Sequence, residues 1–87
     1  MEDIVLISRY NEKHILKHLY DNTYVFLPKD GYMRIGYFDD NKTIAFVDPS
    51  GGPFLHVGST LKENKKKILS IDLVPYNGEK HFALTFE

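Results

Sequence analysis

The stretch Leu69–Phe86, which reads LSIDLVPYNGEKHFALTF, decides most of the fold. Apolar residues recur at every second position on both sides of Asn77-Gly78, and a period of two is typical of β-strands. Asn-Gly favours a type I′ turn, because both central residues of that turn need a positive φ. A two-residue loop there predicts an antiparallel hairpin with apolar pairs on one face and polar positions on the other. The predicted apolar pairs are Leu73 with Phe82, Ile71 with Leu84 and Leu69 with Phe86, and the wetter face has Ser70 opposite Thr85 and Asp72 opposite Ala83.

A second hairpin is predicted upstream, where residues 32–38 and 43–47 flank Asp39-Asp40-Asn41-Lys42. A two-residue loop at Asp40-Asn41 pairs these two runs so that apolar residues share one face, and a four-residue turn keeps the same pairing. The expected partners are Tyr37 with Ile44, Ile35 with Phe46, Gly36 with Ala45 and Asp39 with Lys42.

The first thirty residues predict a mixture of elements. Residues 4–7 and 23–27 are expected to form short strands, as is 54–57 further along the chain. Residues 12–20 are expected to form a helix, capped by Ser8 or Asn11. Its apolar face would consist of Ile15, Leu16, Leu19 and Tyr20. The predicted fold is therefore one small α+β domain over residues 1–87, a mainly antiparallel, strongly bent sheet or small partly open barrel of about five to seven strands with one N-terminal helix.

Composition narrows the function classes. Eleven Lys and Arg against twelve Asp and Glu give a net charge of −1, whereas a general nucleic-acid binder needs a strong cationic excess. The chain has no cysteine, which excludes disulfides, thiolate metal sites and a cysteine nucleophile. Its acidic start lacks the basic region of a secretory signal, and no apolar run near it approaches the roughly 20 residues of a membrane-spanning helix. We therefore expect a cytoplasmic protein without membrane association.

The loop Asp48-Pro49-Ser50-Gly51-Gly52-Pro53 is the most distinctive stretch. It is compatible with a plain turn, in which Asp accepts hydrogen bonds from the backbone and Gly51 takes a positive φ. Alternatively, the successive amides of Ser50, Gly51 and Gly52 form a concave seat for an anion, stiffened by the two prolines. No phosphate-binding loop of the Gly-Lys-Ser/Thr type is present.

Other residues could complete such a site. Lys62–Lys67 form a basic cluster, which is compatible with an exposed charged loop or with a patch that faces one or two phosphates. Surplus tyrosines could stack on a ring or line an interface. The expected ligand-binding residues are Tyr32, Arg34, Ser50, Gly51, Gly52, Phe54, His56, Lys65 and Lys66.

Two histidines, His14 and His18, are spaced i, i+4 and would lie on one side of the predicted helix. Such a pair can chelate a metal, but a third ligand is missing nearby, and a solvated polar helix face explains the spacing equally well. We therefore expect no metal site and no cofactor. No nucleophile elbow or buried carboxylate pair is visible, so an enzyme is not expected and no residue is assigned a catalytic role.

The function expected from these features is binding, without catalysis, of a small phosphorylated ligand such as a nucleotide or cyclic nucleotide signal. Sequestration of such a signal, as in viral counter-defence, is one form this could take. A homo-oligomer is expected, because a chain of this size struggles to enclose a pocket alone. The alternative is a protein–protein inhibitor, immunity protein or antitoxin that docks its partner through a sheet edge or a tyrosine-rich face.

Overall fold

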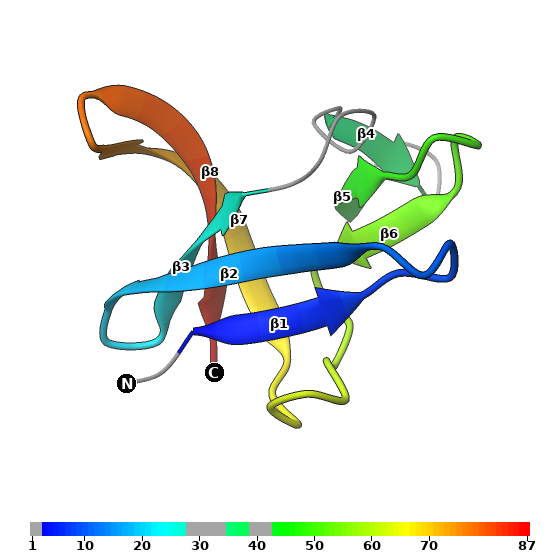
Figure 1. Cartoon of the computed structure of the whole chain (residues 1–87), viewed down its shortest axis with the longest axis horizontal. Helices are drawn as coiled ribbons and strands as arrows, with labels where there is room; N and C mark the ends of the chain where they lie inside the picture. Colours follow the sequence, from blue (N-terminus) through cyan, green and yellow to red (C-terminus); the bar gives the residue numbers. More distant parts are fainter. Residues whose placement is uncertain (1–2, 28–34, 39–42) are drawn as a thin grey trace.

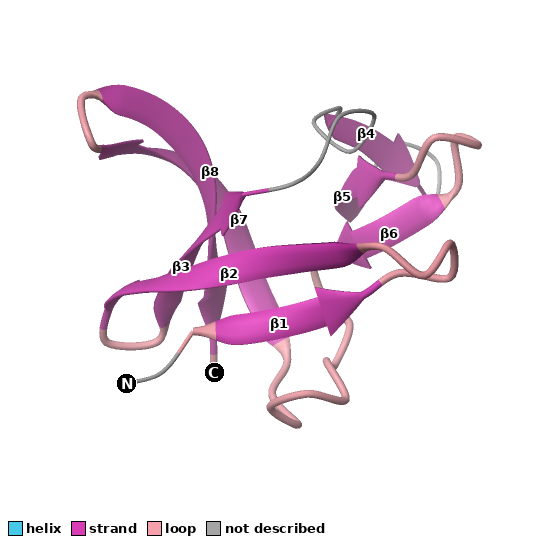
Figure 2. Cartoon of the chain, in the orientation of Figure 1, coloured by secondary structure: helices cyan, strands magenta, loops and turns pink. Residues whose placement is uncertain are grey.

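The computed structural model describes residues 3–27, 35–38 and 43–87, and every regular element in them is a strand (Figures 1 and 2). This all-β architecture contradicts the predicted α+β fold, because the expected N-terminal helix is absent from the described residues. The strands in chain order are β1 (Ile4–Ile7), β2 (Lys13–Tyr20), β3 (Thr23–Leu27), β4 (Ile35–Phe38), β5 (Thr43–Val47), β6 (Pro53–His56), β7 (Ile68–Tyr76) and β8 (Glu79–Phe86).

The strands form two antiparallel sheets. The larger has the order β1-β2-β3-β8-β7, and the smaller has the order β4-β5-β6 (Figure 1). Pairing of β3 with β8 joins the N-terminal strands to the C-terminal hairpin, with Tyr24 opposite Leu84. Across the described residues the two sheets stay separate, so the sheet does not close into a barrel.

Residues 13–20 are a strand because both neighbouring strands pair with them and the side chains alternate between two faces. His14 and Leu16 are buried, with exposed fractions of 1% and 0%, whereas Ile15 between them is 41% exposed. The apolar spacing of this segment fits a helix as well as a strand. Because each residue's local preference differs little between the two, burial of His14 and Leu16 between the sheets decides the outcome.

Ser8 and Asn11, expected to cap a helix, instead shape the turn between β1 and β2. The Ser8 amide donates to the carbonyl of Glu12 at 2.9 Å, and the Ser8 Oγ accepts from the amides of Tyr10 and Glu12. Asn11 has φ 60°, a left-handed conformation that asparagine tolerates better than most residues. A hydroxyl that accepts backbone amides serves a tight turn as readily as a helix start.

The C-terminal hairpin is confirmed, with Asn77 and Gly78 at φ 49° and 82°. Leu73 faces Phe82 and Ile71 faces Leu84, and Ser70 faces Thr85 and Asp72 faces Ala83, as predicted. The predicted division into a wetter and an apolar face is wrong at two positions, because Ala83 is 1% exposed and Leu73 is 53% exposed. A bulge between Ile68 and Ser70 changes the final pair, so Ile68 replaces Leu69 opposite Phe86. Leu69 is consequently 51% exposed.

The upstream hairpin is confirmed in its strand register, with Ile35 opposite Phe46, Gly36 opposite Ala45 and Tyr37 opposite Ile44. The predicted contact of Asp39 with Lys42 lies outside the described residues. The strand expected at 54–57 is β6, which begins and ends one residue earlier.

The core lies between the sheets. Phe46 of β5 packs edge-on against Phe26 of β3 and Phe82 of β8, with ring centroids 4.6 and 5.6 Å apart. None of the described residues forms a helix long and apolar enough to cross a membrane. The buried hydrophobic cluster is Leu6, Leu16, Tyr24, Phe26, Phe46, Leu55, Leu61, Ile68, Ile71, Leu84 and Phe86.

Candidate functional site

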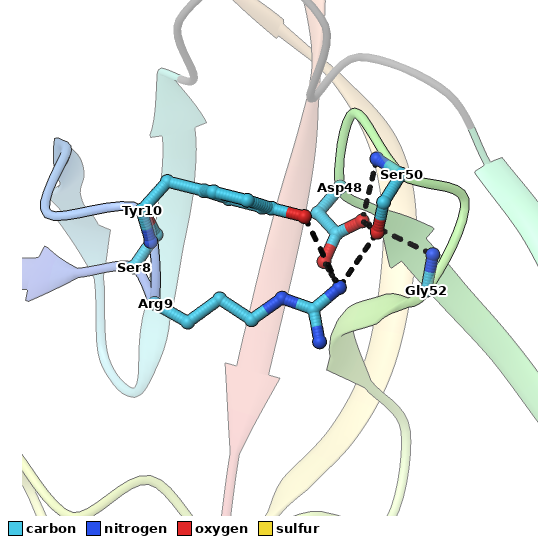
Figure 3. A network of polar contacts seen from close by, with 6 residues as sticks. All are labelled: Ser8, Arg9, Tyr10, Asp48, Ser50 and Gly52. Atoms are coloured by element: carbon cyan, nitrogen blue, oxygen red, sulfur yellow. Dashed lines mark hydrogen bonds and ion pairs between the residues drawn. The ribbon is translucent and has the colours of Figure 1, made fainter.

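The loop after β5 is organised around the carboxylate of Asp48, which is only 3% exposed. Its Oδ1 accepts the amides of Ser50 and Gly52, at 2.9 and 3.1 Å, and the hydroxyl of Ser50 at 2.6 Å (Figure 3). The amide of Gly51 donates to the Asp48 carbonyl at 2.9 Å. All three amides that were expected to form an anion seat are therefore bound to Asp48 itself. An external anion at this loop would have to displace that carboxylate.

Arg9 is the positive partner of this loop, and it comes from the turn between β1 and β2. Its Nη2 lies 2.8 Å from Asp48 Oδ2, 2.6 Å from Ser50 Oγ and 3.3 Å from the hydroxyl of Tyr10 (Figure 3). A Cβ added at Gly52 would meet the same Nη2 at 3.2 Å, so the small residue leaves room for the guanidinium. The network ties two loops from different sheets together.

The charges in this network stabilise one another. The pKa of Asp48 is lowered from its ordinary value, first by the hydrogen bond from the Ser50 hydroxyl and then by the loop amides and the Arg9 charge. The pKa of Arg9 is raised, first by its hydrogen bond with Tyr10 and then by the charge of Asp48. Both groups are therefore held in their charged forms. Sequence reasoning missed Arg9, because no local pattern connects it with a loop 39 or more residues away.

A cavity of about 390 Å³ opens beside this loop, between the end of β1, strand β6 and the segment that follows β6. Its lining combines apolar side chains with polar and charged ones. Its lining residues are Leu6, Ile7, Pro53, Phe54, Leu55, His56, Ser59, Thr60, Leu61, Lys62 and Glu63.

The polar groups of the cavity have defined hydrogen-bonding roles. His56 Nδ1 lies 3.1 Å from the Val57 carbonyl, so the neutral ring that fits this contact donates from Nδ1 and presents Nε2 as an acceptor. The Ser59 hydroxyl donates its hydrogen to the His56 carbonyl at 2.9 Å. Thr60 and Lys62 are the remaining side chains of the cavity able to donate to an anion.

The structure brings together only part of the predicted site. Phe54 and His56 line the cavity, but Ser50, Gly51 and Gly52 do not. Lys65 and Lys66 are also outside the lining, although Lys62 of the same basic cluster belongs to it. The Lys66 ammonium instead donates to the carbonyl of Glu87 at 3.3 Å. Tyr32 and Arg34, the other two predicted residues, lie outside the described residues.

The histidine pair cannot act as the sequence spacing suggested. In a strand, residues i and i+4 are about 13 Å apart, too far for two imidazoles to share one metal ion. His14 is buried against the rings of Phe26 and Phe54, while His18 Nε2 contacts the Asp21 carbonyl at 3.0 Å. Among the described residues, no group of three or more His, Asp or Glu side chains could hold a metal ion.

Comparisons with protein-family models, with curated proteins and with solved structures find no match to this chain.

Proposed function

We propose that this protein binds a small ligand that combines a flat ring with one phosphate, in the cavity between β1, β6 and residues 59–63. The single observation that carries the proposal is the meeting of Phe54, His56, Thr60 and Lys62 around one cavity of about 390 Å³. Ligand pockets have volumes of roughly 300–1,000 Å³ and combine apolar walls with a few convergent polar groups. A mononucleotide is a ligand of this type.

The two ends of the ligand would meet different chemistry. Lys62 supplies a cation and Thr60 a hydroxyl donor, so the phosphate would lie at their end of the cavity. His56 Nε2 would accept a hydrogen bond from a sugar hydroxyl or a ring N–H. Glu63 borders the same cavity and offsets the charge of Lys62, so a monophosphate fits better than a polyphosphate.

A second cavity, of about 270 Å³, is less suited to this ligand. It is lined by Thr43, Ile44, Val57, Leu69, Ser70, Ile71 and Asp72. Its one charged side chain is a carboxylate, which repels phosphate. From the sequence we also expect that the protein is cytoplasmic and that it binds the ligand without catalysing a reaction.

The test is thermal unfolding of the protein with nucleoside monophosphates, cyclic nucleotides and sugar phosphates. Binding to the native state raises the melting temperature as ligand concentration rises. Lys62→Ala should weaken the affinity about tenfold or more, because a charge-assisted hydrogen bond contributes roughly 1.5–3 kcal/mol. Lys65→Ala is the matched control, since Lys65 is exposed and outside the cavity lining. The affinity of this variant for the ligand should equal that of the parent.

Equal losses in both lysine variants would move the site to the whole basic cluster. No response to any phosphorylated compound would remove the proposal and leave the protein–protein alternative. That alternative has its support at the sheet edge rather than in the tyrosines, because exposed Tyr10 precedes the start of β2 whereas exposed Tyr20 is the last residue of that strand. Along the edge strand β1, by contrast, Val5 and Ile7 are 50% and 46% exposed.

A further inference from the structure

The cavity of about 270 Å³ lies where the main chain links the two sheets. On one side of the link, the Val57 amide donates to the Ile44 carbonyl of β5 at 3.0 Å. On the other side, the Gly58 amide donates to the Ile68 carbonyl of β7 at 2.8 Å. The cavity is lined by residues next to this link, which are 43–44 of β5, residue 57 after β6, and 69–72 of β7.

Asp72 is the one charged side chain in the lining of this cavity. It is exposed, and none of the ion pairs among the described residues involves it. In the larger cavity, by contrast, Lys62 and Glu63 offset each other. The charge of Asp72 is therefore available to a cation that enters from outside the chain.

The backbone of Ile71 supplies a further acceptor beside Asp72. The Phe86 amide donates to the Asn22 carbonyl at 2.9 Å, so the backbone groups of Phe86 point away from β7. Backbone direction alternates along β8, and Leu84 therefore also points away from β7. Ile71, which is the partner of Leu84, consequently directs its amide and carbonyl to the open side of β7.

Branched apolar side chains make up much of the remaining lining, namely Ile44, Val57 and Leu69. Leu69 is 51% exposed, because the bulge at the start of β7 removes it from the position opposite Phe86. The volume of about 270 Å³ is slightly below the range of pockets for drug-sized ligands, so the cavity suits a ligand of few atoms.

We propose that this cavity binds a small aliphatic amine, with its ammonium group at Asp72 and its hydrocarbon chain against the apolar side chains. An ammonium group has three N–H donors and no acceptor. The Asp72 carboxylate, the Ser70 hydroxyl and the Ile71 carbonyl are three acceptors along one stretch of β7. This site is separate from the larger cavity, so it goes beyond the proposed binding of a phosphorylated ligand.

Nuclear magnetic resonance of the nitrogen-15-labelled full chain tests the proposal, with 3-methylbutylamine as the probe at pH 7, where alkylamines are protonated. The Kd should be on the order of 1 mM, because the probe is small and Asp72 is exposed. Amide shifts should saturate and should concentrate at residues 43–44, 57 and 69–72. The alcohol 3-methylbutan-1-ol, which has the same hydrocarbon chain without the charge, should bind about fivefold more weakly at the same ionic strength.

Asp72→Asn removes the charge and keeps the shape of the side chain. It should weaken binding of the amine about fivefold, the upper end for an exposed ion pair, and leave the affinity for the alcohol unchanged. Asp21→Asn is the matched control, because Asp21 is exposed and outside the cavity lining. Asparagine also tolerates the φ of 45° at this position, so the control variant should fold.

Two leucines of β7 test the apolar part of the site. Leu69 and Leu73 are 51% and 53% exposed, but only Leu69 lines the cavity. Leu69→Ala should weaken binding of both the amine and the alcohol about threefold, because the ligand loses apolar contact. Leu73→Ala should leave both affinities unchanged.

Equal affinity of the parent protein for the amine and the alcohol would overturn the proposal. Unchanged affinity for the amine in Asp72→Asn would do the same, as would amine-induced shifts that concentrate at the lining of the larger cavity. Absence of saturable shifts at about 50 mM amine would also overturn it. These results would leave the proposed function standing, because nucleotides are tested at the larger cavity through Lys62.

Discussion

Asp48 shows how one buried carboxylate can organise a loop. It accepts two amides and a hydroxyl through one oxygen and pairs with Arg9 through the other. An aspartate before a Pro-Ser-Gly-Gly sequence is expected to hydrogen-bond to the following backbone. The sequence therefore indicates the turn. It does not indicate that the carboxylate takes the place of the external anion for which the same amides are suited.

The first prediction concerns the pH dependence of stability. Because the pKa of Asp48 is lower in the folded protein than its ordinary value of 3.8, its charged form stabilises the fold above that value. This contribution should be lost as pH falls through the lowered pKa. Urea unfolding should therefore give Asp48→Asn a lower midpoint than the parent at neutral pH, and the difference should shrink below pH 3.8.

Asp72→Asn is the control for this measurement, because Asp72 is an exposed carboxylate on β7. At neutral pH its unfolding midpoint should differ little from that of the parent, because substitutions at exposed positions usually change stability by less than about 0.5 kcal/mol. Asp3 also has a lowered pKa, first through its hydrogen bond from the His18 amide, but it is present in all three proteins and cancels in the comparison. A constant gap between parent and Asp48→Asn at all pH values would contradict the account of this loop.

Among the elements, tight turns that contain residues in the left-handed conformation join the paired strands of each hairpin in the larger sheet. Asn11, Asp21, Asn77 and Gly78 all have positive φ. Asp21-Asn22 forms a two-residue connection, with Tyr20 paired to Thr23. Asn and Asp tolerate this conformation better than other residues with a Cβ. The hairpins are thus specified locally, by turn residues at the correct spacing.

The second prediction tests this local control. Gly78→Ala should destabilise the protein by about 1 kcal/mol, because φ 82° is unfavourable for a residue with a Cβ. No atom lies within 4 Å of the added carbon, so the cost is conformational rather than steric. Urea unfolding followed by tyrosine fluorescence measures it. Gly36→Ala should cost less than about 0.5 kcal/mol, since its Cβ would make an ordinary 3.4 Å contact with Val47. Equal costs would contradict the prediction.

At the scale of the whole molecule, aromatic packing holds the two sheets together. Phe46 from the smaller sheet contacts Phe26 and Phe82 from the larger one. Phe54 of the smaller sheet likewise lies against His14 of the larger one, with ring centroids 5.0 Å apart. Such contacts link residues distant in sequence, so they form only when the complete fold does.

The third prediction follows from this packing. Phe46→Ala should destabilise the protein by about 3–5 kcal/mol, because it removes a fully buried ring from between the sheets. In a domain of this size the melting temperature should fall by at least about 10 °C. Leu73→Ala, at a half-exposed position, should cost about 1 kcal/mol or less. Similar losses in the two variants would show that Phe46 does not join the sheets.

The candidate site was likewise predictable only in part. Phe54 and His56 are two residues apart on one strand, and both line the cavity. Ser50, Gly51 and Gly52 do not line it. Their amides are hydrogen-bonded to Asp48 instead. The wall formed by Leu6 and Ile7 could not be found from sequence, because they lie more than forty residues before β6.

Alternation and turn residues were enough to predict the two hairpins and most of their strand register, because both act over a few neighbouring positions. The C-terminal bulge was not foreseen, because it depends on which of Ile68 and Leu69 packs better against the rest of the core. That residues 13–20 form a strand and that Arg9 pairs with Asp48 could be seen only in the folded chain. The physical reason is that strand pairing and ion pairing between distant segments gain free energy only when the whole chain brings them together.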